Sequence, residues 1–151
     1  MTGGCPKSEK NAHAKAFQSD AVLPFPMPEY MLLIRNDIDH QADWTADRHV
    51  QYLKECEAYI LKLKKDGKIV AAQPLVKEGA IISQTADGWN VRPMRGQGEV
   101  QVGYYHVLAR DMDEAIEMAK GSPEFAYGKK ARIEIRPVRT NERDTGFVYP
   151  R

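Results

Sequence analysis

Two helix patterns in this sequence each lie between two strand patterns, and this alternation most restricts the possible folds. The first helix is predicted from Asp43 or Thr45, either of which can cap it, to Lys65. The second is predicted to begin after Asp111, with Glu114 completing a capping-box-like pair three residues later. Apolar residues recur along the first helix at spacings of three and four, which predicts one packed stripe: Val50, Leu53, Cys56, Ile60 and Leu63.

Short apolar or alternating runs predict the strands. They lie at 30–34, 68–72, 80–85, 89–91, 101–109 and 131–136. Asp87-Gly88 indicates a hairpin turn between the third and fourth of these runs. The order is strand, helix, strand, hairpin, strand, helix, strand. It predicts an α+β, ferredoxin-like βαββαβ sandwich with an extra hairpin.

Right-handed crossovers place both helices of such a sandwich on one face of the sheet. The first strand is apolar on both sides, and Tyr104 and Tyr105 supply an aromatic to each face of the strand at 101–109. The uncovered face would then be a large exposed apolar patch. We therefore expect a second copy of the chain to bury it, in a homodimer of the dimeric α+β barrel type.

Charge and cysteine content exclude several classes of protein. The 22 Lys and Arg nearly balance the 21 Asp and Glu, which argues against direct nucleic-acid binding. The apolar runs are far shorter than the ~20 residues of a membrane span. Cys5 and Cys56 form neither a disulfide framework nor a CxxC pair, so we expect a cytoplasmic protein with reduced thiols.

The ends of the chain differ from the predicted domain at 30–138. Residues 1–29 are rich in proline and glycine, without helix or strand period and without the apolar stretch of a secretory signal. They are interpreted as an extended arm, which is either a mobile leader or is laid over the domain or a partner subunit. Residues 139–151 form a basic tail. Residues 129–151 hold seven Lys and Arg against three Asp and Glu, which is net +4.

His49 borders the apolar stripe in the first turns of the long helix. Such a residue is either a satisfied structural histidine or a general base. Asp66 lies at the other end of the same helix, ~25 Å away, so only a dimer or another fold-back would bring the two together. A metal is conceivable near the acids and imidazoles of 36–49, but the glycine and glutamate of a calcium loop are missing. We expect a polar turn there, and neither metal nor cofactor.

His106 lies in the middle of a predicted strand, and the polar residues expected to line the open sheet face with it are Tyr104, Arg132, Glu134 and Arg136. One interpretation is that these residues belong to a dimer interface. The other is a polar cavity for an anionic or phenolic ligand, with arginine as the anion partner. Trp44 and Trp89 are candidates for the walls of such a cavity, or for ordinary packing.

Five segments in order resemble the YCII-related family, including its DGPF branch. They are YMLLIRN at 30–36, KKDGKIVAAQPL at 64–75, VGYYHVLARDMDEAIEMAK at 102–120, Ser122-Pro123, and ARIEIRPV at 131–138. The resemblance implies a ferredoxin-like sandwich that dimerises through its sheets. It also implies a catalytic histidine in the first helix, matched by His49, and a companion aspartate near the next turn, for which Asp66 is the nearest candidate. Where the DGPF branch carries its signature, this chain has Val91-Arg92-Pro93-Met94, and only the proline matches.

Two functions follow as hypotheses. The family includes a dehydrochlorinase acting on a chlorinated hydroxyquinol, and similar sandwiches include lactone isomerases and cofactor-free monooxygenases. The first hypothesis is a small cofactor-free enzyme with isomerase- or lyase-like proton transfer on a phenolic or enol-type molecule. His49 would move the proton, and Tyr105, His106 and Arg132 would orient the substrate, with Trp44 beside it. The alternative is a non-catalytic ligand-binding or accessory dimer, because DGPF-type proteins are often linked to sigma-factor regulation.

Overall fold

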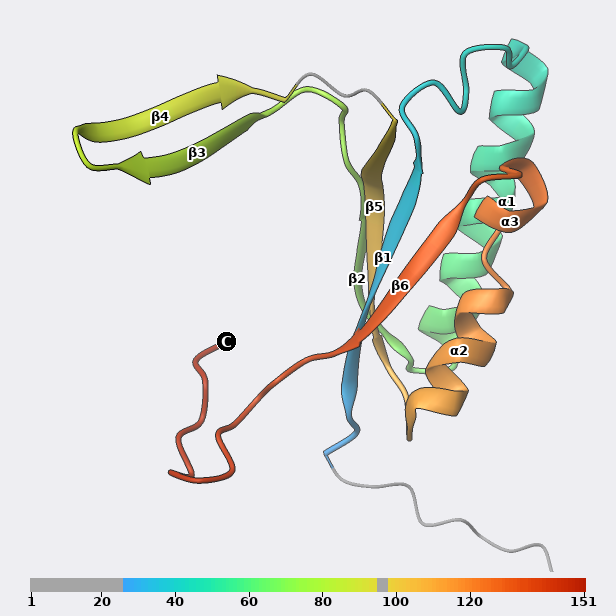
Figure 1. Ribbon diagram of the computed structural model, residues 1–151. Coiled ribbons are helices and arrows are strands. Elements are labelled where there is room, and N and C mark those ends of the chain that lie inside the picture. The colour runs from blue at the N-terminus through green and yellow to red at the C-terminus, as the bar shows by residue number, and fades with distance from the viewer. Residues whose placement is uncertain (1–25, 95–97) are drawn as a thin grey trace, which may run out of the picture.

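A computed structural model describes residues 26–94 and 98–151 (Figure 1). The elements in chain order are β1 (Glu29–Asp37), α1 (Ala46–Lys65), β2 (Ile69–Pro74), β3 (Ala80–Thr85), β4 (Gly88–Pro93), β5 (Glu99–Leu108), α2 (Met112–Lys120), α3 (Glu124–Tyr127) and β6 (Arg132–Pro137). The predicted arm falls almost entirely outside the described residues.

Four strands form one antiparallel sheet in the order β2-β5-β1-β6, and β3 and β4 form a separate two-stranded sheet. All three helices lie on the same side of the larger sheet (Figure 1). The predicted α+β class is therefore confirmed, with both long helices on one face. The short helix α3 was not predicted, because a four-residue segment after Pro123 is too short to show a helical period.

The core lies between this sheet and the helices. Leu32 on β1 and Val107 on β5 are fully buried, and Ala115 on α2 packs with them. Residues alternate between buried and half-buried from Tyr30 onward in β1 and from Gly103 onward in β5, as the two-residue period of a strand requires. Tyr105 and Val107 of β5 face the helices, which agrees with the predicted placement of Tyr104 and Tyr105 on opposite faces of this strand.

The buried face of α1 differs from the predicted stripe. Val50 is 49% exposed and Leu53 is 50% exposed, whereas Tyr52 and Leu63 are buried. Tyr59 packs against the core and donates a hydrogen bond to the Met118 carbonyl at 2.7 Å. The stripe was wrong in its first half because tyrosines turn an apolar ring inward while their hydroxyls find partners.

Local capping explains where the helices begin. Thr45 caps α1 by accepting the Arg48 N–H, and Asp111 caps α2 by accepting the Glu114 N–H at 2.9 Å. The Glu114 carboxylate accepts the Arg110 N–H at 2.6 Å and also pairs with the Lys68 ammonium. It thereby ties the start of α2 to the chain that leads into β2.

We expect Glu114 to make the fold sensitive to acid. Partial burial raises the pKa of its carboxyl, but the Arg110 N–H and the Lys68 ammonium outweigh that effect, so the pKa lies below the ordinary 4.5. The stabilisation is present above 4.5 and is lost as pH falls through the lowered value. Thermal melting of Glu114→Gln should show a lower melting temperature than wild type at pH 6, and the difference should shrink by pH 3. Glu117→Gln is the control, since the exposed Glu117–Lys120 pair contributes little, and equal pH profiles for both variants would contradict the assignment.

The face of the sheet away from the helices is more polar than predicted. Leu33 and Tyr104 lie on it, and so does Arg35. The Arg35 guanidinium pairs with the Glu99 carboxylate at 3.8 Å and with the Glu134 carboxylate at 3.4 Å. Three alternate residues of β6 add charges to this open face, namely Arg132, Glu134 and Arg136. The apolar patch that the first strand indicated is thus interrupted by a ladder of ion pairs.

Candidate functional site

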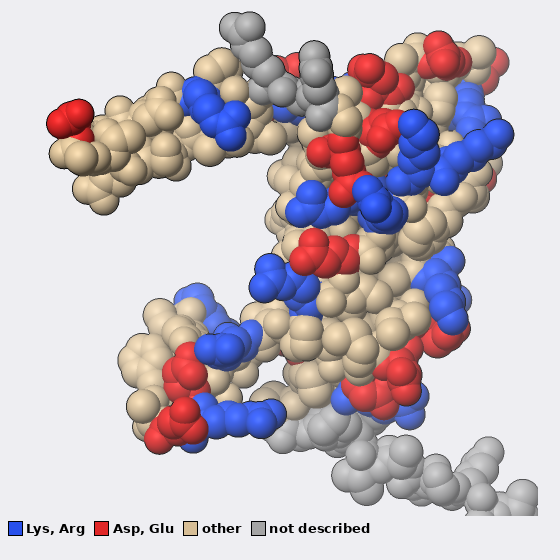
Figure 2. All heavy atoms as spheres, in the orientation of Figure 1, with Lys and Arg blue, Asp and Glu red and all other residues tan. Residues whose placement is uncertain are grey.

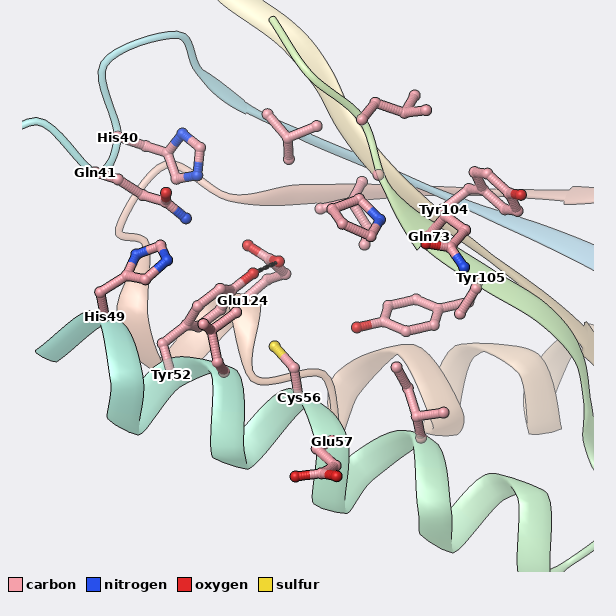
Figure 3. Close-up of a pocket in the computed structure, with 18 of the residues that line it drawn as sticks. His40, Gln41, His49, Tyr52, Cys56, Glu57, Gln73, Tyr104, Tyr105 and Glu124 are labelled. Carbon is pink, nitrogen blue, oxygen red and sulfur yellow. Dashed lines mark hydrogen bonds between the residues drawn. The ribbon is translucent and has the colours of Figure 1, made fainter.

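A cavity of about 670 Å³ lies between α1 and the sheet (Figure 3). This volume is within the range of small-molecule sites. His49, Tyr52 and Cys56 reach it from α1, Tyr105 from β5 and Glu124 from α3. Its walls are otherwise largely apolar and include Ile34, Leu53, Ile60, Ala72, Leu75 and Val102.

Helical spacing brings three of these side chains together. His49, Tyr52 and Cys56 follow one another at intervals of three and four, so they lie along one side of α1. In Figure 3 the Cys56 sulfur and the Tyr105 hydroxyl both point into the space between the helix and the sheet. His49 stands at the N-terminal end of this row, below His40 and Gln41.

A buried carboxylate closes one side of the cavity. Glu124 is 5% exposed and accepts a hydrogen bond from the hydroxyl of Tyr52, which is 8% exposed (Figure 3). Burial, and then the hydrogen bond to Glu124, raises the pKa of Tyr52. The phenol therefore stays protonated at neutral pH and donates to the carboxylate.

The Tyr105 phenol and the Cys56 thiol of the cavity are also held in their neutral forms. Burial raises the pKa of Tyr105, and the neighbouring ionisable groups of Cys56 and Glu124 raise it further. Burial likewise raises the pKa of the Cys56 thiol. A protonated thiol is a poor nucleophile, so this site offers hydrogen-bond donors and proton carriers rather than a thiolate.

An aromatic cluster holds His49 at the mouth of the cavity. The Trp44 ring lies 6.1 Å from the His49 ring and 5.1 Å from the Tyr52 ring. The Arg48 guanidinium sits 5.2 Å from the centres of both Trp44 and Tyr127. Trp44 thus packs against both His49 and Tyr52 and helps to fix the position of the His49 ring.

The structure gathers some of the predicted site residues and separates others. His49 and Tyr105 line the cavity, and Trp44 packs beside it. Asp66 is the exposed C-cap of α1, at the far end of the helix from His49. His106 lies on the open face, 2.9 Å from the Glu29 carboxylate, and Arg132 pairs there with Glu99. Within this one chain, none of these three residues lines the cavity with His49.

Sequence reasoning missed Tyr52 and Glu124. Tyr52 stands three residues after His49, and that spacing was the available signal. Glu124 had none, because it reaches the cavity only through the packing of α3 on α1. Cys56 was recognised as part of the stripe but not as a cavity residue.

Among residues 26–94 and 98–151, no three His, Cys, Asp or Glu side chains gather as metal ligands would. None of the helices described has the length and apolar character needed to cross a membrane.

In comparisons with known proteins, the sequence matches no family model and no curated protein.

Proposed function

We propose that this protein is a small cofactor-free enzyme that moves a proton on a phenolic or enol-type small molecule, in an isomerase- or lyase-like reaction. The observation that carries the proposal is the cavity that combines an imidazole, a buried carboxylate and two neutral phenols within apolar walls. Such a set provides a proton acceptor and hydrogen-bond donors in a volume suited to one aromatic or lactone ring.

Each polar group has a role in this proposal. His49, at the mouth, takes the proton from the substrate carbon or hydroxyl. Tyr105 donates a hydrogen bond to the oxygen on which negative charge develops, and it can do so because its pKa is raised and it keeps its proton. Glu124 accepts the single O–H proton of Tyr52 and so fixes the Tyr52 ring as part of the cavity wall.

We further propose a ferredoxin-like sandwich that pairs as a dimeric α+β barrel. The strand order β2-β5-β1-β6, with both long helices on one face, supports the sandwich. The open face, with half-buried Met31 and Leu33, supports a second copy as its cover. The alternative function, a non-catalytic ligand-binding or accessory dimer, shares this assembly and differs only in what the cavity does.

A thermal-shift screen tests the cavity. Phenols, quinols, lactones and carboxylates are added to wild type, His49→Ala and His106→Ala. A ligand that binds the native state at 100 times its Kd adds about 2.7 kcal/mol of stability, which raises the melting temperature by several degrees. We expect a hit to lose its shift in His49→Ala and to keep it in His106→Ala, because His106 lies on the open face.

Turnover of the hit then separates enzyme from binding protein. We expect His49→Ala to lower the rate by about 10²- to 10⁴-fold, as for loss of a general base. Unchanged turnover in His49→Ala would remove this mechanism. Binding without any turnover would favour the accessory dimer, and a shift lost only in His106→Ala would move the site to the open face.

A further inference from the structure

The β3–β4 hairpin has one apolar face that the other residues described by the structure, within 26–94 and 98–151, leave uncovered. Directly opposed residues of a hairpin share a face, and the pairs Ile82 with Val91 and Gln84 with Trp89 lie on the same one. Ile82 is 63% exposed, Val91 is 62% exposed and Trp89 is 69% exposed. The intervening pairs, such as Ser83 with Asn90, form the opposite, more polar face.

This pattern is that of a sheet face built to be buried. Every residue of β3 and β4 is exposed, and a lone two-stranded hairpin is marginally stable in water. The hairpin is almost free of charge, with Asp87 at its turn and Arg92 near its root, and it is tan over most of its length in Figure 2. A partner that covers Trp89 and its neighbours would supply the missing burial.

The position of the hairpin indicates what the partner is. It projects from one end of the sheet on the side of the open face, and the C-terminal segment, residues 138–151, projects on the same side at the other end (Figure 1). This segment is folded back on itself by the Asn141–Val148 bridge. It too exposes apolar side chains, since Phe147 is 55% exposed and Val148 is 70% exposed.

The open face of the sheet lies between the hairpin and the C-terminal segment, and its charges are compatible with the same face of a second copy of the chain. Arg35 lies between Glu99 and Glu134, Arg132 pairs with Glu99, and Arg136 lies 3.8 Å from Glu134. Because positive and negative groups alternate, two such faces can approach each other without net repulsion. A surface of one sign would instead favour a partner of opposite charge.

We propose that the hairpin is a dimerisation arm, whose apolar face packs on the C-terminal segment of a second copy of this chain. In a face-to-face dimer, the two-fold axis can lie between the two sheets and run perpendicular to the strands. The hairpin end of one sheet then lies opposite the C-terminal-segment end of the other. The hairpin of each copy is then brought to the C-terminal segment of the other, and the same contact is made twice. This contact is independent of the cavity chemistry, and it goes beyond the proposed cover of the sheet face by naming the segments that meet.

Sedimentation measurements over a range of concentrations test the arm. We expect wild type to dimerise and the double variant Ile82→Ser with Trp89→Ser to raise the dimer Kd at least 100-fold. The control is Ser83→Ala with Asn90→Ala on the opposite face, which should leave the Kd within about threefold. Circular dichroism should be unchanged in both, because the hairpin stands apart from the core. A monomeric wild type, or an unaffected dimer in the apolar-face variant, would overturn the proposal.

Cross-linking identifies the segments that meet. In a Cys5→Ser, Cys56→Ser background, Trp89→Cys and Val148→Cys are made in separate preparations and then mixed with a short bismaleimide. We expect cross-linked heterodimers from the mixture and far fewer cross-links from either preparation alone. Cross-links confined to like pairs, or none in a sample that sediments as a dimer, would reject the contact. Ligand shifts at the cavity are read separately, so failure of the arm and failure of the proposed enzyme are distinguishable.

Discussion

Leu32→Ala should lower the free energy of unfolding by about 3 kcal/mol, the size of effect seen when a large buried side chain leaves a cavity. Leu32 is 0% exposed on the central strand β1, where Tyr105 of β5 and Ile135 of β6 are its neighbours. Strands on both sides and helices above hold these neighbours in place, so they have little room to collapse into the space. Denaturant unfolding, followed by circular dichroism at several protein concentrations, measures the loss.

Leu33→Ala is the matched control. It removes the same atoms from the next residue of the same strand, but on the open face, where Leu33 is only half-buried. At concentrations that keep the chain monomeric, we expect less than half of the Leu32 effect. Equal losses for the two variants would mean that the assignment of inner and outer faces of β1 is incorrect.

Glu124→Ala should destabilise the protein by about 2 kcal/mol, because it leaves the buried Tyr52 hydroxyl without its acceptor. Combining it with Tyr52→Phe should cost less than the sum of the two single losses, with a coupling energy of roughly 1–3 kcal/mol. A double-mutant cycle from denaturant unfolding gives this number. Glu57→Ala, an exposed acidic residue at the edge of the same cavity, is the control and should stay within about 0.5 kcal/mol of wild type.

The same variants link stability to the proposed function. If Tyr52 and Glu124 act as one unit at the cavity, a ligand found by thermal shift should bind more weakly to both single variants than to Glu57→Ala. Additive losses, with no coupling between Tyr52 and Glu124, would show that the hydrogen bond contributes little. The pair would then be a packing detail of α3 rather than part of the site.

Local signals accounted for most of the elements. Thr45 and Asp111 cap helices as their side chains predict, because a cap needs only the backbone of the next turn. The hairpin formed where Asp87-Gly88 indicated it, with Gly88 at a φ of 136°, in the positive region that glycine adopts readily. The alternation of β5 correctly separated Tyr105 from Tyr104 and His106.

The candidate site was predicted only in part. His49 was recognised from its place in the helix, and Tyr105 from its strand, and both line the cavity. Glu124 and its contact with Tyr52 were not predicted, because they join residues 72 positions apart through packing of α3 against α1. Asp66 was suggested by the family pattern, but a straight helix holds it at the opposite end from His49.

By itself, the sequence determined the order of the strands and the two longer helices, the start of each of those helices and the inward face of β5, since hydrogen-bonding caps and side-chain periods act over a few residues. Only the tertiary structure decided which side of α1 is buried, and that a cavity remains beneath it. It also decided that the hairpin extends beyond the open face with its apolar side exposed. These outcomes depend on how volumes and charges from distant segments fit together, and no local pattern records that fit.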